Sequence, residues 1–227
     1  MQRRPEAAVP QITRMIVDQL LDGSLRRGQK LSTARVAEMT NVSRVPVREA
    51  LRELSVLGVI DYLPNRGFRV PPLPGTLELE ALLDVRDLLE PEAHAYAAER
   101  ATDEEVAAIV DAFERGTLAE SAGEYGQAAR LHHRGLRAIV DASHHPELQR
   151  VLTPLIIRSA LHFPAVRAAA DAEGLKGHRS SAQAIADRDP EQARLRAQEH
   201  LAFLRRLVET VAPDERPRVR IRRRTLP

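Results

Sequence analysis

The sequence contains no cysteine and no tryptophan, and only 3% of its 227 residues are aromatic. The absence of cysteine excludes a disulfide framework, a zinc thiolate cluster and a thiol nucleophile. No stretch approaches the roughly 20 consecutive apolar residues that a membrane-spanning helix needs. We therefore expect a cytoplasmic protein with a mainly aliphatic core, with no export signal and no membrane partner.

The net charge of +2 hides an uneven distribution of charge along the chain. Residues 1–72 carry twelve basic and seven acidic side chains, whereas residues 73–213 carry sixteen basic and twenty-three acidic ones. Residues 214–227 are basic again, with six arginines against two acidic residues. An excess of positive charge at the ends of the chain predicts an anionic partner there.

Three prolines in four positions, at Pro71, Pro72 and Pro74, mark the clearest break in the sequence. Such a stretch favours an extended, semi-rigid spacer, so we place a domain boundary there. We expect one domain over residues 1–72 and a second over 73–213, followed by a disordered basic tail over 214–227.

Hydrophobic spacing before this break predicts a helix that ends near Gly23, a short helix over 33–40 and another helix that begins after Ser43. The hydroxyl of Ser43 is expected to cap that helix. Residues 59–70 predict a β-hairpin with its turn at 64–67. This order of elements predicts a winged helix-turn-helix with a small hairpin wing.

After the break the spacing of apolar residues is helical throughout. Thr102 and Glu105 fit a capping box, and further helices are expected near 124–141, 146–161, 174–187 and 190–211. No strand signal follows Val70. The expected fold is therefore mainly α, with an all-helical bundle of six or seven helices as the second domain.

Three arginines mark one face of the helix that begins after Ser43. Arg44, Arg48 and Arg52 recur every four residues, while the apolar residues Val47, Ala50, Leu51 and Leu54 share another face. Arginine binds guanine edges with two hydrogen bonds and also neutralises phosphates, as reading a major groove requires. The alternative is a solvated arginine face without a ligand. The adjacent wing tip, Asn65 to Gly67 with Arg66 between them, favours DNA.

Long stretches of the sequence resemble a known family of bacterial transcription regulators, the GntR family. The resemblance rests on residues 31–38, on the run from Val42 to Leu54, which contains the specific signature Ser-Arg-x-Pro-Val-Arg-Glu-Ala-Leu, and on 58–60 and 65–70. Residues 85–105, 137–143 and 178–201 are similar to the FadR-type ligand-binding domain of that family. The resemblance covers almost the whole chain and implies a non-enzymatic regulator.

The resemblance implies which residues contact double-stranded DNA. Arg44 and Arg48 fall at base-reading positions, and Ser43, Val45 and Pro46 fall at the phosphate-facing start of the helix. Arg35 is displaced by one residue from the position of a further family arginine. With Arg52 of the arginine face and Asn65 and Arg66 of the wing tip added, the full expected set is Arg35, Ser43, Arg44, Val45, Pro46, Arg48, Arg52, Asn65, Arg66 and Gly67.

The resemblance also implies a buried divalent metal held by an Asp-x3-His pair and two further histidines. Histidine ligands of this kind suit zinc or nickel. His178 and His200 match the two further histidines. His132 replaces the aspartate, Leu136 replaces the first histidine, and Gly135 replaces a usual aromatic. A site of three histidines, His132, His178 and His200, is one reading, and metal-free histidines that line a pocket are the other.

Arg86 lies among leucines at a position that in the family points into the effector cavity. A buried guanidinium must have a partner, which is either an acidic ligand or a residue of the domain such as Glu90. The expected effector set is Arg86, His132, Leu136, His178 and His200.

These observations predict a homodimeric, ligand-responsive repressor that binds an inverted-repeat operator and is released by a small carboxylate metabolite. Two alternatives differ from it in class. In one, the metal ion itself is the effector. In the other, the histidine cluster serves a metal-dependent hydrolase, but no nucleophile or carboxylate base stands at motif spacing.

Overall fold

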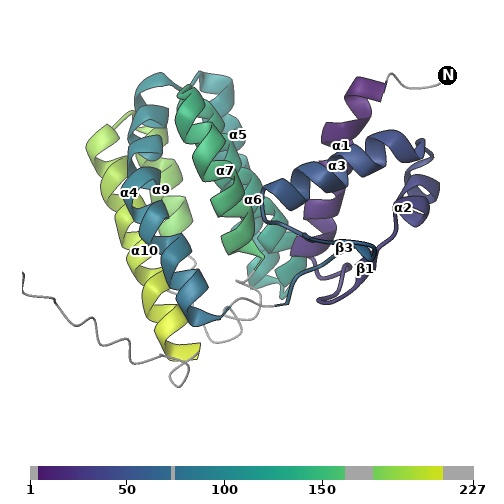
Figure 1. Ribbon diagram of the computed structural model, residues 1–227. Helices are drawn as coiled ribbons and strands as arrows, with labels where there is room; N and C mark the ends of the chain where they lie inside the picture. Colours follow the sequence, from purple (N-terminus) through teal and green to yellow (C-terminus); the bar gives the residue numbers. More distant parts are fainter. Residues whose placement is uncertain (1–4, 73–74, 162–175, 212–227) are drawn as a thin grey trace, which may run out of the picture.

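A computed structural model describes residues 5–72, 75–161 and 176–211, which form two parts (Figure 1). The first part is a small helical domain with a three-stranded sheet, and the second is a helical bundle. Among the described helices none is long and apolar enough to cross a membrane. The mainly α fold class predicted from the sequence is confirmed.

The first part is built on three helices, α1 (Pro5–Leu21), α2 (Thr33–Thr40) and α3 (Arg44–Val56). Their apolar faces share one aliphatic core that includes Ile12, Ile16, Val47 and Leu51. The chain turns between α2 and α3 at Asn41, which adopts a left-handed conformation and ends α2. This short turn fixes the mutual orientation of α2 and α3 in a helix-turn-helix.

The wing has three strands, in the order β1-β3-β2, and all pairs are antiparallel. The expected hairpin consists of β2 (Asp61–Leu63) and β3 (Gly67–Arg69). The edge strand β1 (Lys30–Leu31) was not predicted, because the sequence around it reads as a turn. It pairs with Phe68 and Arg69, almost forty residues further along the chain.

Six described helices form the second part: α4 (Thr76–Arg100), α5 (Asp103–Ser121), α6 (Tyr125–Ala142), α7 (Pro146–Ala160), α9 (Lys176–Ala186) and α10 (Pro190–Val211). α4 packs along α10, and α5 packs along α6 (Figure 1). The predicted capping box at the start of α5 is present, with Thr102 and Glu105 bonded reciprocally. The predicted basic tail lies outside the described residues.

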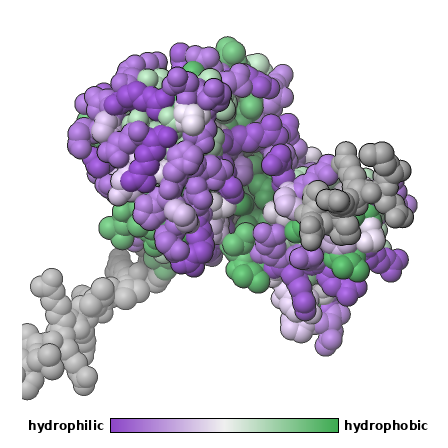
Figure 2. Space-filling view, turned by 90° about the horizontal axis from the view of Figure 1, so that it is seen from above, coloured by the Kyte–Doolittle hydropathy of each residue, from purple (hydrophilic) through white to green (hydrophobic). Residues whose placement is uncertain are grey.

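The two parts meet along α6 and the end of α7. On one side, Arg134 of α6 binds Asp18 of α1 at 3.0 Å, and Arg130 binds Asp22. Beside these ion pairs, Ile157 and Leu161 are buried in the hydrophobic core of the first part. Figure 2 shows hydrophobic residues along this junction. The first part and the bundle therefore share both polar and apolar contacts.

Candidate functional site

Helix α3 presents the arginine face that the sequence predicts. Its buried side includes Val47, Leu51 and Leu54, which pack into the core of the first part. Arg44, Arg48 and Arg52 are exposed, and no ion pair within the described residues neutralises them. Exposed guanidiniums without acidic partners remain available to phosphates and base edges.

The start of α3 differs from the prediction at two residues. Ser43 occupies the N-cap position, but its hydroxyl makes no capping hydrogen bond and is exposed. Pro46 is buried together with Val47 in the first turn, which is not the exposed position expected of it, and its contact with DNA stays a prediction. Val45 points outward with 72% of its surface exposed and can contact a groove.

The wing tip is shaped by two residues with positive φ, Asn65 at 61° and Gly67 at 80°. Between them Arg66 is exposed, and its amide donates to the carbonyl of Leu63 at 2.9 Å. This tight turn projects Arg66 outward from the sheet. Arg35 is also exposed, on α2, where Ser32 caps the helix by accepting from the Arg35 amide. All the DNA-facing residues predicted from the sequence except Pro46 thus lie wholly or partly on the surface.

Three predicted histidines meet inside the helical part. His132 comes from α6, His178 from α9 and His200 from α10, and each is at most 7% exposed. The ring centres of His132 and His178 lie 4.9 Å apart, and those of His178 and His200 lie 3.9 Å apart. Phe113 of α5 stacks on His178 at 4.9 Å with an interplanar angle of 11°. We call these four rings the histidine cluster.

Three helical glycines give the histidine cluster its space. A Cβ at Gly116 would lie 2.3 Å from Cδ2 of His132, and one at Gly135 would lie 2.6 Å from Cζ of Phe113. A Cβ at Gly177 would lie 2.9 Å from Nδ1 of His200. The Gly135 position explains one departure from the family pattern, because the ring of Phe113 occupies the room that a side chain there would need.

The histidine cluster does not fit a divalent metal as arranged. Within the described part of the chain, no group of three His, Asp or Glu side chains is placed to hold an ion. The ring centres of neighbouring histidines lie 4.9 and 3.9 Å apart, and Leu136 places a buried apolar side chain at one of the family's ligand positions. The three-histidine metal site and the metal-free pocket both stay predictions.

Arg86 forms an ion pair with Glu90 of the same helix, α4. Its Nε and Nη2 donate to the two carboxylate oxygens of Glu90 at 2.7 and 2.9 Å, and both side chains are 1% exposed. The sequence offered an acidic ligand or Glu90 as the partner of Arg86, and the structure pairs Arg86 with Glu90. A buried, bidentate pair of this kind keeps the guanidinium satisfied without a ligand.

Two buried histidines of the bundle have lowered pKa values. Burial lowers the pKa of His94 to about 4. The charge of Glu90 acts against this shift, and the charge of Arg86 adds to it. Nδ1 of His94 lies 2.6 Å from the hydroxyl of Ser181, and its Nε2 lies 4.0 Å from Glu90. Burial also lowers the pKa of His133 to about 4, with Arg137 and Arg134 adding to the effect. Both rings are therefore neutral at pH 7.

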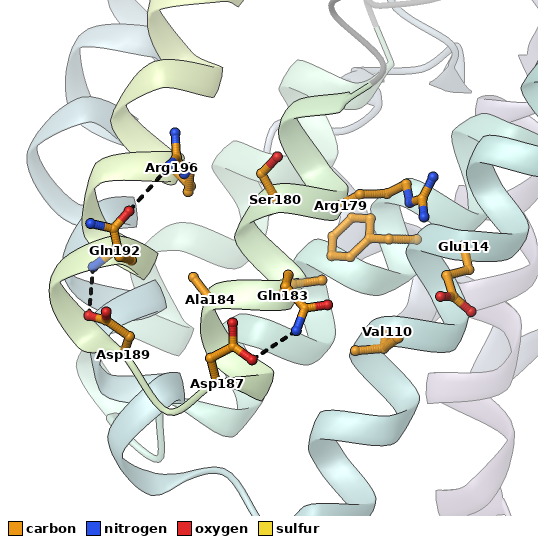
Figure 3. A pocket seen from close by; sticks show the side chains of 12 residues that line it. Val110, Glu114, Arg179, Ser180, Gln183, Ala184, Asp187, Asp189, Gln192 and Arg196 are labelled. Carbon is orange, nitrogen blue, oxygen red and sulfur yellow. Dashed lines mark hydrogen bonds between the residues drawn. The ribbon is translucent and has the colours of Figure 1, made fainter.

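A groove of about 640 Å³ lies over α9, between α5 and α10 (Figure 3). Ser180, Gln183 and Ala184 of α9 line its floor together with Asp187, directly after α9, and Phe113 joins it to the histidine cluster. The sequence analysis did not identify this groove, since its residues lack a motif and meet only in the folded bundle. Its size is typical of small-molecule sites.

Helix α6 connects the interior of the bundle to the first part. His132 and Leu136 are buried on one face, while on another face Arg134 pairs with Asp18 of α1 and Arg130 pairs with Asp22, directly after α1. A displacement of α6 caused by a ligand in the bundle would thus be transmitted directly to α1. The role of Arg130 and Arg134 was not predicted, because ion pairs more than a hundred residues apart leave no local pattern.

Comparison with known proteins matches both parts of the chain. Residues 9–70 match the family described as bacterial regulatory proteins, gntR family, and residues 81–203 match the FCD domain. The HTH-type transcriptional regulator McbR of Escherichia coli is 30% identical over 155 residues, covering 67% of this chain and 70% of that protein. The HTH-type regulator YcbG of Bacillus subtilis is 29% identical over 208 residues, covering 86% and 87%.

A solved structure agrees in fold with the whole described arrangement. The structure of E. coli McbR/YncC superposes with a TM-score of 0.73 at 25% identity, over 89% of this chain and 97% of that one. The order of a winged helix-turn-helix followed by a helical bundle is thus common to both proteins.

Proposed function

Because this chain belongs to the GntR family of transcription regulators and carries an FCD domain, we propose that it is a ligand-responsive repressor that binds operator DNA in the cytoplasm. The observation that carries the proposal is the exposed arginine face of α3 beside the wing. A recognition helix with free guanidiniums and a basic wing tip suits the major groove and the adjacent backbone.

The DNA-binding half of the proposal is tested with the region upstream of the protein's own gene. We expect Arg48→Ala to cost about 1 to 3 kcal/mol of operator affinity and to relax specificity at one base position. Arg66→Ala should weaken binding more evenly across sequences, because it contacts the backbone. Arg115→Ala, on the exposed surface of α5, is the control. Equal affinity of wild type and Arg48→Ala would contradict the assignment.

We further propose a homodimer that reads an inverted repeat, because one short recognition helix specifies too few base pairs. Helix α4 offers a surface for it. Leu77, Val85 and Leu88 are 50%, 38% and 76% exposed, and with exposed Ala81 they form one apolar stripe. We expect Leu88→Glu to shift the protein toward monomer in light scattering, whereas Leu118→Glu, an equally exposed position on α5, should not. A wild-type monomer at micromolar concentration would refute the dimer.

The proposed switch uses α6 as the coupling element. An effector that binds the bundle stabilises one position of α6, and the pairs of Arg130 and Arg134 transmit it to α1. The consequence is a changed spacing of the two recognition helices in the dimer. Deleting the gene should raise transcription from the operator if the protein is a repressor, and lowered transcription would identify an activator.

Metal dependence is a separate part of the proposal. The packing of the histidine cluster supports a regulator that works without zinc or nickel, with His132, His178 and His200 as polar walls of the effector region. Untagged protein should contain substoichiometric metal that does not fall in His178→Ala or His200→Ala. A full equivalent of metal that disappears in both variants would restore the three-histidine site. Operator binding that then depends on the ion alone would make the ion the effector.

A further inference from the structure

The groove over α9 has opposite charges at its two ends. Arg179 and Arg196 lie near one end, and Asp187 and Asp189 lie near the other (Figure 3). Glu114 of α5 adds a third carboxylate to the lining. With two guanidiniums against three carboxylates, a simple anion would meet net repulsion in this groove. A ligand that carries both an anionic and a cationic group would be complementary to both ends.

The groups at the basic end differ in availability. Arg196 binds Glu199 at 2.7 Å and the side chain of Gln192 at 3.3 Å. Arg179 is exposed and has no ion pair to any described residue. Arg86, the anion partner expected from the sequence, is held by Glu90. Of the two guanidiniums that line the groove, Arg179 is thus the better placed to accept an anionic group.

The acidic end is held in place by its own hydrogen bonds. The side-chain amide of Gln183 donates to Oδ1 of Asp187 at 2.8 Å, and the backbone N–H of Gln192 donates to Oδ1 of Asp189 at 3.0 Å. Each bond uses one oxygen of its carboxylate, so the other oxygen remains for a cation. Two positioned carboxylates at the end of a groove suit an ammonium group.

The helix sets the distance between the two ends. Arg179 lies on α9 and Asp187 in the turn directly after it, eight residues further along the chain, or about 12 Å at the usual helical rise of 1.5 Å per residue. Three extended residues of peptide span about 10 Å. Phe113 and Val110 line the side of the groove and give an apolar surface between the two charged ends.

We infer that the groove over α9 binds a zwitterion about as long as a tripeptide, with its anionic group at Arg179 and its ammonium group at Asp187. An apolar middle part packs on Phe113, whose other neighbour is His178 of the histidine cluster. The inference that this ligand is the effector rests on the proposed regulatory function. Phe113 also lies beside His132 of α6, with ring centres 6.1 Å apart, so only one side chain would separate the ligand from α6.

The test uses three probes that differ only at their ends: the tripeptide Ala-Phe-Ala, its N-acetylated form and its C-terminal amide. Binding to the full-length protein is measured by calorimetry. We expect each capped form to bind about five- to tenfold more weakly than the free tripeptide, since each loses one charge-assisted contact. Absence of binding by the free tripeptide at millimolar concentration, or equal binding of all three probes, would overturn the inference.

Two variants assign the ends of the ligand. Arg179→Gln should abolish the difference between the free tripeptide and its amide, and Asp187→Asn should abolish the difference between the free and acetylated forms. Arg115→Gln and Asp111→Asn are matched controls, because this exposed ion pair lies on α5 outside the groove. Unchanged discrimination in Arg179→Gln would refute the assignment.

Operator binding is measured on the same preparations without peptide. A protein that binds its operator and ignores the tripeptide would contradict the groove ligand and leave the regulatory function intact. A protein that binds the tripeptide at Arg179 but binds no operator would contradict the regulatory function instead. Release of operator by the free tripeptide, and not by its capped forms, is the result expected of an effector.

Discussion

Acid should destabilise this protein through two buried histidines before its carboxylates titrate. Burial holds the pKa values of His94 and His133 at about 4, whereas an unfolded histidine has a pKa of about 6.5. The unfolded chain therefore binds more protons than the folded protein between these values. The stabilising contribution is complete above about pH 6.5 and is lost as the pH falls toward 4.

The magnitude follows from the distance between the two pKa values. At pH 5 each ring should reduce the free energy of unfolding by about 2 kcal/mol relative to pH 7, and both together by about 4 kcal/mol. Glu92 and Glu105 have lowered pKa values, through Arg194 and the Thr102 amide respectively, so they stay charged at pH 5. A loss of about 4 kcal/mol is a large part of the free energy of unfolding of a typical native protein, which is about 5 to 15 kcal/mol.

Urea denaturation at pH 7 and pH 5 measures this loss. His94→Asn keeps a hydrogen-bonding group near Ser181, and His133→Leu replaces a buried ring whose Nε2 has no hydrogen-bond partner. Each variant should lose about 2 kcal/mol less than wild type between the two pH values. His144→Gln, at a half-exposed ring that contacts Glu105, shows the effect of removing a histidine that is not buried. The same loss in wild type and in both buried variants would refute this account.

Three further changes probe the packing around these groups. Glu90→Gln should lower the free energy of unfolding by about 3 to 5 kcal/mol in urea, because it leaves the guanidinium of Arg86 buried without a countercharge, and replacing both residues by apolar ones should recover most of it. Gly116→Ala should cost about 1 to 3 kcal/mol, since its Cβ would stand 2.3 Å from the ring of His132; unchanged stability would mean that the ring moves freely. Asp18→Ala removes one partly exposed ion pair and should cost less than about 1 kcal/mol by thermal unfolding.

Local patterns predicted the elements of this fold well. The capping box of Thr102, the helix breaks and the arginine face of α3 depend on neighbouring residues and were readable from spacing. Strand β1 was missed because its stability comes from pairing with Phe68 and Arg69, far along the chain. The burial of Pro46 was not predicted because a residue in the first helical turn can face either way, and only packing decides.

The candidate sites depended more on tertiary structure. The sequence predicted that His132, His178 and His200 belong together, and they do meet. It offered both a ligand and Glu90 as partners of Arg86, and i, i+4 spacing alone could not choose between them. The groove over α9 and the glycines around the histidine cluster carry no local signal, since their roles arise from three helices that come together.

The shared core at the junction limits how this protein can be recombined. Ile157 and Leu161 belong to the bundle by sequence but are buried with Ile12 and Ile16 of the DNA-binding part. A gene fusion that exchanged only residues 1–72 would separate these residues from the surface that covers them, and the hybrid would expose apolar surface on both sides. DNA specificity is therefore changed most easily through the surface residues of α3. Replacement of the whole DNA-binding part requires compensating changes at the end of α7.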